Sequence, residues 1–459
     1  MSSLIVSGGL IAAEYGTFRG DVVVRNGQIA ALVDDASDVD GPRIDAAGAV
    51  VFPGGVDMHT HLREPSKIVR EDFAYGTASA VAGGITTVAE MPQADPLVQD
   101  VESFRAKLAA ASANSIADFG LYAAATGQSA EDLAALQREG VLAFKAFMST
   151  SSPGYPPLED ASLLECLQHL SRLGAMLIVH AENDNLLQAG LVRMAAAGRT
   201  DPLAHAESRP PIVETTAIAT AVRLAEESGA RLHVAHVSTP EGARIVASAG
   251  ARGVAVTCET CPQYLLFDLD DLARLGVWAR CAPAIRERSD VEGLWPLVLD
   301  GTISAIASDH SPYTHEEKMR GEHDIFKAAL GLNVIQVMLP AVFDEGVHRR
   351  GLTYSRFAEL SAAGPARILG LYPRKGSIRV GADADLAIWD PEAEWDVRRE
   401  DLFSRHPWTP LEGRKLRGKV VATVRRGEVV FHDGAVLADP GSGAFLHGAS
   451  TYTTDRNGV

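Results

Sequence analysis

Two histidines stand one residue apart at the end of an apolar run, in the segment PGGVDMHTHLREP. Side chains alternate in direction along a β-strand, so His59 and His61 would point to the same face. Their two imidazoles can therefore reach one metal ion. An HxH pair alone is weak support for a metal site, and the interpretation depends on residues further along the chain.

Four further polar residues end separate apolar, strand-like runs. They are Lys145 in VLAFKAFMS, His180 in AMLIVHAEN, His236 in RLHVAHVS and Asp309 in ISAIASDHSP. Taken singly, His180 or His236 would more often be a satisfied core histidine, and Asp309 would more often cap a helix. Together with the HxH pair, they predict a site for two divalent metal ions. Zinc is the expected metal, because it accepts imidazole and carboxylate ligands.

Lys145 lies between Phe144 and Phe147, and burial of a lysine in such apolar surroundings is costly. Desolvation lowers the pKa of the amine and frees it as a nucleophile, which can add carbon dioxide to form a carbamate. A carbamate would offer one oxygen to each metal ion. The pattern predicts hydrolysis of an amide by a hydroxide shared between the metals. Asp309 would take the proton from the water and deliver it to the leaving nitrogen.

Strands and helices alternate between about residues 53 and 375, and these elements must position the polar residues. Apolar runs separated by segments with helical spacing are typical of a parallel sheet covered by helices. The strand candidates are residues 49–61, 84–92, 117–126, 141–149, 175–183, 231–238, 253–262 and 303–312. Eight such units predict an α/β fold, a TIM-like (β/α)8 barrel, whose active site lies at the carboxyl ends of the strands.

The two ends of the chain have a different character. Residues 1–52 and 376–440 contain short strands separated by turns, among which Asn26-Gly27 is a strong hairpin signal. We expect both ends to fold into one small β-sandwich domain, with the hydrolase barrel of residues 53–375 inserted between them. Residues 441–459 form a C-terminal tail that we expect to be loosely held.

The chain of 459 residues has a formal net charge of -17. Nucleic acids and anionic membranes need basic patches, so neither is an expected partner. No apolar run approaches the length of a membrane-spanning helix, and the first residues lack the basic segment of a signal peptide. Four cysteines in a chain of this length do not indicate a disulfide framework. The cytoplasm is therefore the expected location.

Sequence blocks along nearly the whole chain resemble the cyclic amidohydrolases, which include allantoinases, hydantoinases, dihydropyrimidinases and dihydroorotases. The blocks are PGGVDMHTHLREP, AGGITTVAEMP, FKAFMS, VHAEN, HVAHVS, TCETCPQYL, CAPAIRER, SDHSPYTHEEK and HPWTPLEGRKLRGKV. The resemblance implies a barrel with a small β-domain, a small cyclic amide as substrate, and a homotetramer or homodimer. The metal ligands that it implies are His59, His61, Lys145 as a carbamate, His180, His236 and Asp309.

The resemblance leaves three kinds of substrate open. The segments AFKAFMS, AESRPPIVETTAI and ETCPQYLLF are similar to those of allantoinases, which makes allantoin the leading substrate and allantoate the product. The segment FKAALGLN, which ends at Asn333, is closer to hydantoinases. Arg63 follows the HxH pair as in dihydroorotases, where the resemblance implies that it holds a substrate carboxylate. Gln93 stands where dihydroorotases carry an asparagine.

The expected substrate-binding residues are Arg63, Gln93, Cys281 and Asn333. An alternative for Arg63 is a structural ion pair with Glu64 or Glu71. A further alternative, from a different class of function, is a non-catalytic scaffold, because some relatives have lost metal ligands and act in assembly or signalling. All six expected ligand positions are kept in this chain, which favours an enzyme.

Overall fold

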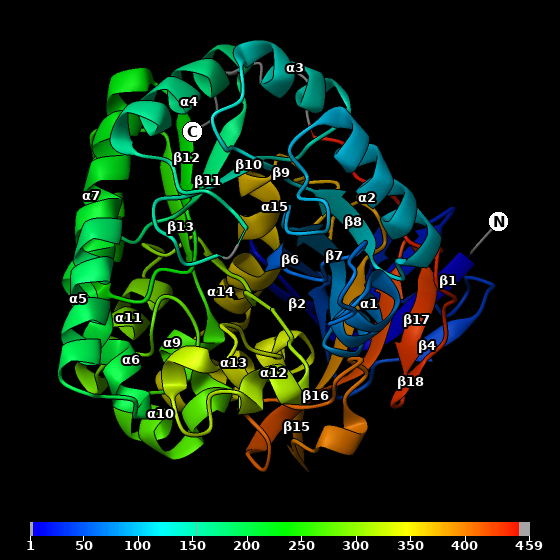
Figure 1. The fold of residues 1–459 in the computed structure, drawn as a ribbon. Helices are drawn as coiled ribbons and strands as arrows, with labels where there is room; N and C mark the ends of the chain where they lie inside the picture. The colour runs from blue at the N-terminus through cyan, green and yellow to red at the C-terminus, as the bar shows by residue number, and fades with distance from the viewer. Residues whose placement is uncertain (1–2, 153, 449–459) are drawn as a thin grey trace.

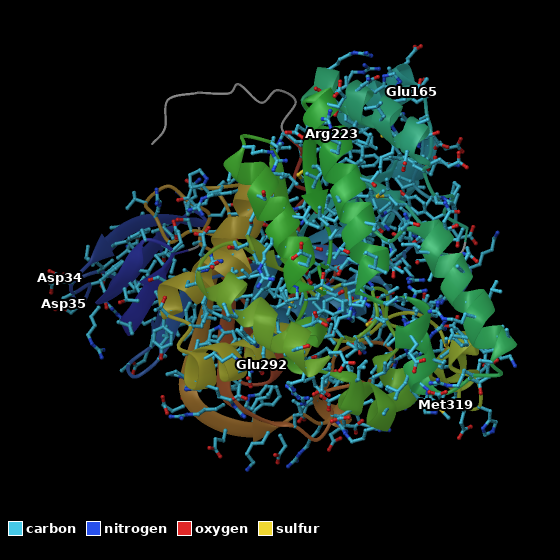
Figure 2. All side chains as sticks on the ribbon, turned by 90° about the vertical axis from the view of Figure 1, so that its left-hand side faces the viewer. Asp34, Asp35, Glu165, Arg223, Glu292 and Met319 are labelled. Carbon is cyan, nitrogen blue, oxygen red and sulfur yellow. The ribbon has the colours of Figure 1, made fainter. Side chains whose placement is uncertain are left out.

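The computed structural model describes residues 3–152 and 154–448. A ring of parallel strands surrounded by helices forms its centre, and the β-rich unit lies to one side (Figure 1). Seen from the side, the first strands project away from the helix-covered barrel, with Asp34 and Asp35 at their outer edge (Figure 2). No helix among the described residues is long and apolar enough to cross a membrane.

The barrel contains a strand within each of the eight expected segments. They are β6 (Gly55–Thr60), β7 (Ile85–Glu90), β8 (Asp118–Leu121) with its continuation β9 (Ala123–Ala124), β10 (Phe144–Phe147), β11 (Met176–His180), β12 (Arg231–Val234), β13 (Val256–Thr260) and β14 (Ala305–Ile306). Neighbouring strands pair in parallel, and a parallel bridge between Thr60 and His310 closes the ring. The predicted (β/α)8 barrel is confirmed.

Helices surround the barrel, and the last of them packs against side chains of the barrel interior, among them Met58 and Ile178 (Figure 1). The helices are α1 (Phe73–Ala82), α2 (Val101–Asn114), α3 (Ala130–Arg138), α4 (Asp160–Leu173), α5 (Asp184–Ala196), α6 (Pro202–Ser208), α7 (Pro211–Ser228), α8 (Pro240–Ala251), α9 (Pro262–Leu266), α10 (Leu269–Leu275), α11 (Arg288–Leu299), α12 (His315–Met319), α13 (Ile335–Arg350), α14 (Tyr354–Ala358) and α15 (Gly364–Ile368). Local chemistry starts many of them. Asp100, for example, caps α2 by accepting a hydrogen bond from the Ser103 backbone.

The two ends of the chain share one nine-stranded sheet. Its strands are β1 (Ser3–Ala13), β2 (Gly16–Arg25), β3 (Gln28–Val33), β4 (Arg43–Asp45), β5 (Val50–Pro53), β15 (Leu386–Asp396), β16 (Lys415–Arg425), β17 (Glu428–His432) and β18 (Ala435–Val436). The two halves join where β5 pairs antiparallel with β15. Asn26 and Gly27 form the expected hairpin turn, both with positive φ. The predicted small β-domain from both termini is confirmed, while its exact bounds stay a prediction.

One expected strand, residues 49–61, is divided between two sheets. β5 belongs to the sheet of the chain ends and β6 to the barrel, with Gly54 between them. A Cβ atom at position 54 would lie 2.3 Å from Oγ1 of Thr86, so glycine allows the chain to pass close to β7. The sequence does carry a signal of the break, because Pro53, Gly54 and Gly55 interrupt the apolar run beside the expected domain boundary after residue 52.

Part of the expected tail packs against the barrel. Ala444 and Leu446 exchange backbone hydrogen bonds with Phe119 of β8, and Leu446 is buried. The apolar pair Phe445-Leu446 is the physical reason, since its burial ties down residues that composition alone marks as loose. Residues 449–459 lie outside the described residues.

A buried cluster of charges joins the barrel to the β-domain. Nζ of Lys375 lies 2.5 Å from Asp118 at the start of β8, 2.7 Å from Asp385 and 3.1 Å from Asp383. All four side chains are buried. Burial opposes the charged amine, but the three carboxylates outweigh it and raise the pKa of Lys375. The lysine is therefore a structural cation that holds three acids between the two units.

Replacing Lys375 with methionine should destabilise the protein strongly, because three buried carboxylates would lose their shared cation. We expect a loss of about 3–5 kcal/mol in the free energy of unfolding, measured by urea denaturation. The control is Arg374→Met, which removes an exposed ion pair to the same Asp383 and should cost about 1 kcal/mol or less. Equal unfolding midpoints for the two variants would contradict the structural role of Lys375.

Candidate metal centre

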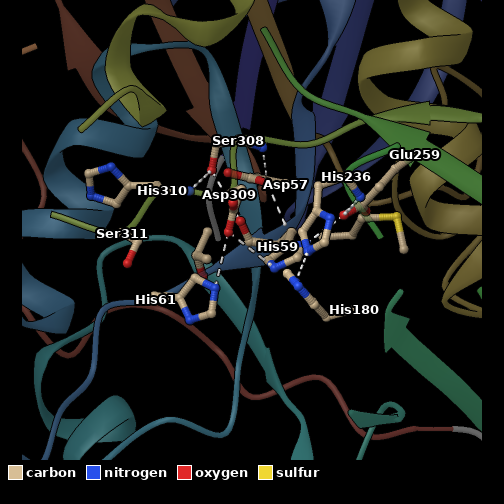
Figure 3. Close-up of polar contacts among 12 residues, drawn as sticks. Asp57, His59, His61, His180, His236, Glu259, Ser308, Asp309, His310 and Ser311 are labelled. Atoms are coloured by element: carbon tan, nitrogen blue, oxygen red, sulfur yellow. Dashed lines mark hydrogen bonds and ion pairs between the residues drawn. The ribbon is translucent and has the colours of Figure 1, made fainter. Parts of the chain in front are cut away.

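All six expected metal ligands line one small pocket at the carboxyl ends of the barrel strands. They are His59, His61, Lys145, His180, His236 and Asp309. Figure 3 shows the four imidazoles and the Asp309 carboxylate turned toward one another. The six side chains lie close together because the carboxyl ends of the parallel strands are all at one rim of the barrel. Their roles as ligands remain predictions, which the geometry below supports.

Three of these residues form one candidate metal group. Nε2 of His59 lies 3.3 Å from Oδ1 of Asp309, and Nε2 of His61 lies 3.2 Å from the same oxygen. Their ligand atoms all lie within 4.8 Å of one another. Two imidazole nitrogens and a carboxylate at this separation are a donor set that zinc accepts.

The other three residues lie on neighbouring strands. Nδ1 of His180 and Nε2 of His236 are 3.0 Å apart, and the rings of His59 and His236 are 5.3 Å apart between centroids. Lys145 is fully buried, and its Nζ has no hydrogen-bond partner among the described residues. A buried amine without an acceptor is costly, so this donor set fits a second cation and a modified lysine. Burial also lowers the pKa of Lys145 to about 8.

Two buried carboxylates orient the imidazoles from behind. Glu259 lies 2.5 Å from Nδ1 of His59, and Glu182 lies 2.8 Å from Nε2 of His180. Arg209 pairs with Glu182 at 2.9 Å and, with His180, outweighs burial, so the pKa of Glu182 falls well below its usual range. Metal-binding histidines commonly donate their second ring N–H to a carboxylate in this way. The opposite ring nitrogens, Nε2 of His59 and Nδ1 of His180, are left to face the pocket.

A third carboxylate fixes the turn that follows β6. Glu90 accepts hydrogen bonds from the backbone N–H groups of Leu62 and Arg63 and from the hydroxyl of Thr60. Lys107 on α2 neutralises it, with Nζ 2.9 Å from Oε1, and both side chains are fully buried. The ion pair of Glu90 with Lys107 therefore fixes the direction in which residues 60–63 leave β6.

Three residues of the pocket have left-handed backbone conformations. The φ angles are 62° at Arg63, 40° at His236 and 48° at Asp309. Residues other than glycine adopt such angles at an energetic cost, which persists where the surroundings fix them, often at functional sites. With these backbone angles the three side chains line the pocket, a direction that an extended backbone at the same position would not give them.

Sequence reasoning missed the three supporting carboxylates, Glu90, Glu182 and Glu259. A signal was present, because each stands in or directly after an apolar, strand-like run, in TTVAEMP, VHAEN and VTCETCP. A carboxylate buried in such a run needs a cation or hydrogen-bond donors. The pattern could have indicated that partners exist, but not which residues they are.

Arg63 and Gln93, two of the expected substrate-binding residues, line the metal pocket and also a larger cavity of about 830 Å³ outside it. The Arg63 guanidinium donates to the Ser311 hydroxyl at 2.6 Å and to the Tyr313 hydroxyl at 2.8 Å. Glu64 and Glu71, the two alternative partners, instead accept hydrogen bonds from the backbones of Phe73 and Arg405. Arg63 forms no ion pair with an acid in the part of the chain that the structure describes, so its charge is available to the pocket.

Cys281 and Asn333 lie elsewhere. The Cys281 thiol donates to the carbonyl of Pro283, and the Asn333 amide donates to the Ser404 hydroxyl and the His406 carbonyl. Neither residue lines either cavity. The structure therefore does not bring these two expected substrate-binding residues together with Arg63 and Gln93.

Comparison with known proteins agrees with this geometry. The model of the amidohydrolase family matches residues 50–430. The chain belongs to the amidohydrolase family. It is 44% identical to an allantoinase of Rubrobacter xylanophilus, over 96% of this chain and 97% of that protein. It is 35% identical to an L-hydantoinase of Paenarthrobacter aurescens, over 97% and 98%. The solved L-hydantoinase from Arthrobacter aurescens superimposes with a TM-score of 0.95 at 34% identity, covering 97% of this chain and all of that one.

Replacing Glu259 with glutamine should weaken binding of divalent metal by about 10–100-fold, because a neutral amide supports the His59 imidazole less well. The affinity can be measured by zinc titration against a chelating dye. Glu241→Gln, at an exposed position in the first turn of α8, is the matched control and should leave the affinity unchanged. Equal affinities in the two variants would show that Glu259 does not support a metal ligand.

Proposed function

We propose that the protein is a metal-dependent hydrolase that opens a cyclic amide or ureide ring, with allantoin as the leading substrate. The observation that carries this proposal is the meeting of four imidazoles, Asp309 and an unpartnered buried Lys145 in one pocket. The allantoinase and L-hydantoinase relatives support the same reaction class, since both match over nearly the full chain.

The residues divide into two candidate metal positions. His59, His61 and Asp309 would hold one ion, and His180 with His236 would hold the other. Lys145, as a carbamate, would reach both. When bound, two divalent ions, with zinc the expected metal, would polarise the ring carbonyl and lower the pKa of water toward neutrality.

Lys145 is suited to carbamate formation because its amine is buried and lacks a hydrogen-bond partner. A pKa of about 8 leaves a useful share of the amine neutral near pH 7, and the neutral form attacks carbon dioxide. The ammonium first loses one proton, the neutral amine forms the N–C bond, and a second proton leaves the nitrogen, so the lysine changes from a cation to an anion. That change would place negative charge beside the imidazoles in the pocket.

Asp309 is suited to move protons. Burial would raise the pKa of its carboxyl, but His59 and His61 outweigh that effect and lower it. The carboxylate is therefore ionised at neutral pH and can accept the proton of the attacking water. As the ring C–N bond breaks, the same group delivers the proton to the leaving nitrogen, and the carbonyl carbon becomes a carboxylate.

A dihydroorotate-like ring is an alternative substrate, because of Arg63. Its guanidinium is held by two neutral hydroxyls and lines the metal pocket, so a substrate carboxylate could be its counter-ion. Gln93 lies beside it, and its Oε1 has no partner among the described residues, which leaves an acceptor for a ring N–H. Five-substituted hydantoins come directly after allantoin as candidate substrates, which the L-hydantoinase relative supports.

A homodimer or homotetramer and a cytoplasmic location also remain proposals. All four cysteines lie in the described chain as free, buried thiols, which is compatible with a reducing compartment.

Ring-opening kinetics test the function. Protein reconstituted with zinc and bicarbonate is assayed on allantoin, dihydroorotate, dihydrouracil and 5-substituted hydantoins side by side. A clear preference for allantoin would support the leading proposal, and preference for dihydroorotate would support the Arg63 alternative. Absence of turnover on all of these rings, with stoichiometric metal bound, would contradict the proposed reaction class.

Lys145→Ala should lose tight binding of the second metal ion and nearly all activity, because no group would remain to reach both positions. Metal content per chain and turnover are measured together, with Lys67→Ala, at an exposed position, as the control. Added acetate should restore part of both properties if the lysine acts as a carboxylate-like group. A fully active Lys145→Ala protein with two metals bound would refute the bridging role.

A further inference from the structure

The outer cavity, which we call the vestibule, has a cationic lining in a chain whose formal net charge is -17. It opens beside the metal pocket and shares Arg63, Gln93 and Tyr313 with it. Six cationic side chains line the vestibule: Arg63, Lys67, Arg70, Arg280, Arg320 and Lys327. Only two acidic residues, Asp95 and Glu317, lie in the same lining of this described cavity.

Four of the six cations are neutralised by acids nearby. The pairs are Lys67 with Asp95 at 3.3 Å, Arg70 with Glu317 at 2.7 Å, Arg320 with Glu316 at 3.1 Å and Lys327 with Asp324 at 3.3 Å. Arg63 and Arg280 have no acid partner among the described residues. The positive charge of the vestibule is therefore concentrated on these two guanidinium groups.

Arg280 is the more unusual of the two. It is only 7% exposed, its side chain makes no hydrogen bond or ion pair within the described chain, and its Nε is buried without a partner. Burial, followed by the like charge of Arg209, lowers its pKa to about 10, which still leaves it charged at neutral pH. A buried charge without a counter-ion is unfavourable in the protein alone and favours an anion from outside.

Lys318 contacts the backbone of Arg280 and provides no counter-ion for its guanidinium. Its fully buried Nζ donates to the carbonyls of Arg280, Ala329 and Gly331. Burial lowers the pKa of Lys318 to about 7, so its charge is partial at neutral pH. The carbonyl contacts hold the backbone of Arg280 in place, which leaves its guanidinium as the fixed charge.

We propose that Arg280 forms an anion subsite in the vestibule that takes a carboxylate carried by the substrate outside its ring. Arg280 lines the vestibule but not the metal pocket, whereas the carboxylate created by ring opening would arise at the metal pocket. The group held by Arg280 is therefore an exocyclic substituent. Guanidinium forks match carboxylates in shape and charge.

This inference rests on the proposed ring-opening function and extends its substrates to rings with acidic side chains. The test compares hydantoin-5-acetic acid with hydantoin-5-acetamide, which have the same ring and nearly the same size but differ in charge. We expect kcat/KM for the acid to exceed that for the amide by about 10–100-fold, the range of hydrogen bonds to charged groups. A ratio near one in the natural protein would overturn the subsite.

Arg280→Met should bring this ratio toward one by raising KM for the acid, with the kinetics of the amide unchanged. Arg280→Lys should keep part of the preference. The matched control is Arg320→Met, which removes a vestibule cation already paired with Glu316 and should leave the ratio intact. An unchanged ratio in Arg280→Met would assign the acid preference to another group and overturn the role of Arg280.

Two further measurements separate the alternatives. Free acetate should raise KM for the acid and leave the amide unaffected, whereas equal inhibition of both would place the anion at the metal pocket and overturn the vestibule assignment.

If neither ring nor allantoin is hydrolysed, the proposed function fails. Calorimetric binding of the acid and the amide then still tests the subsite, through tighter binding of the acid that is lost in Arg280→Met.

Discussion

The carboxylates buried behind the barrel rim are the constraint on which the site depends. Glu90, Glu182 and Glu259 are buried away from water, so each must be satisfied by protein groups in a fixed geometry. Satisfying Glu259 and Glu182 uses one ring nitrogen of His59 and one of His180 and leaves the other nitrogen facing the pocket. Because each carboxylate must be paired, it holds its imidazole in a fixed orientation. The second nitrogen of each ring then faces the pocket and is a better electron donor to a metal ion.

Buried cations in this molecule fall into two groups, and the difference separates structure from function. Lys107 pairs with Glu90 and holds the turn after β6, and Lys375 pairs with three aspartates and holds the junction with the β-domain. Lys145 and Arg280 are also buried and line cavities, but neither forms an ion pair with an acid among the described residues. Stability alone would not favour such an arrangement, which is why these two residues carry the proposals made above.

The barrel and the six candidate ligands could be predicted because they depend on local patterns and on one general rule. Apolar runs identify the strands, and the carboxyl ends of parallel strands must meet. The supporting carboxylates could not be paired from sequence, since Glu259 and His59 meet across the barrel with no local relation. The break at Gly54, by contrast, has a local signal, since Pro53, Gly54 and Gly55 interrupt the apolar run.

The substrate-binding residues show the same limit. A resemblance between segments indicated Cys281 and Asn333, but it carries no information on where a side chain points. In the structure, Asn333 ties down the loop at Ser404 and His406 instead of facing the pocket. Arg63 does face the pocket, because Glu90 holds its backbone in a left-handed conformation that no sequence pattern specifies.

The pairing of β5 with β15 has a consequence for how the chain is made. Val51 is hydrogen-bonded in register with Ile388, so one edge of β5 has no partner until most of the polypeptide has left the ribosome. At about 5–20 residues per second, that edge stays open for on the order of tens of seconds during synthesis. The nascent chain therefore carries an apolar, unpaired strand edge through most of its translation, which is a site for mispairing with other chains. Pairing with β15, rather than closure of the barrel, covers this edge.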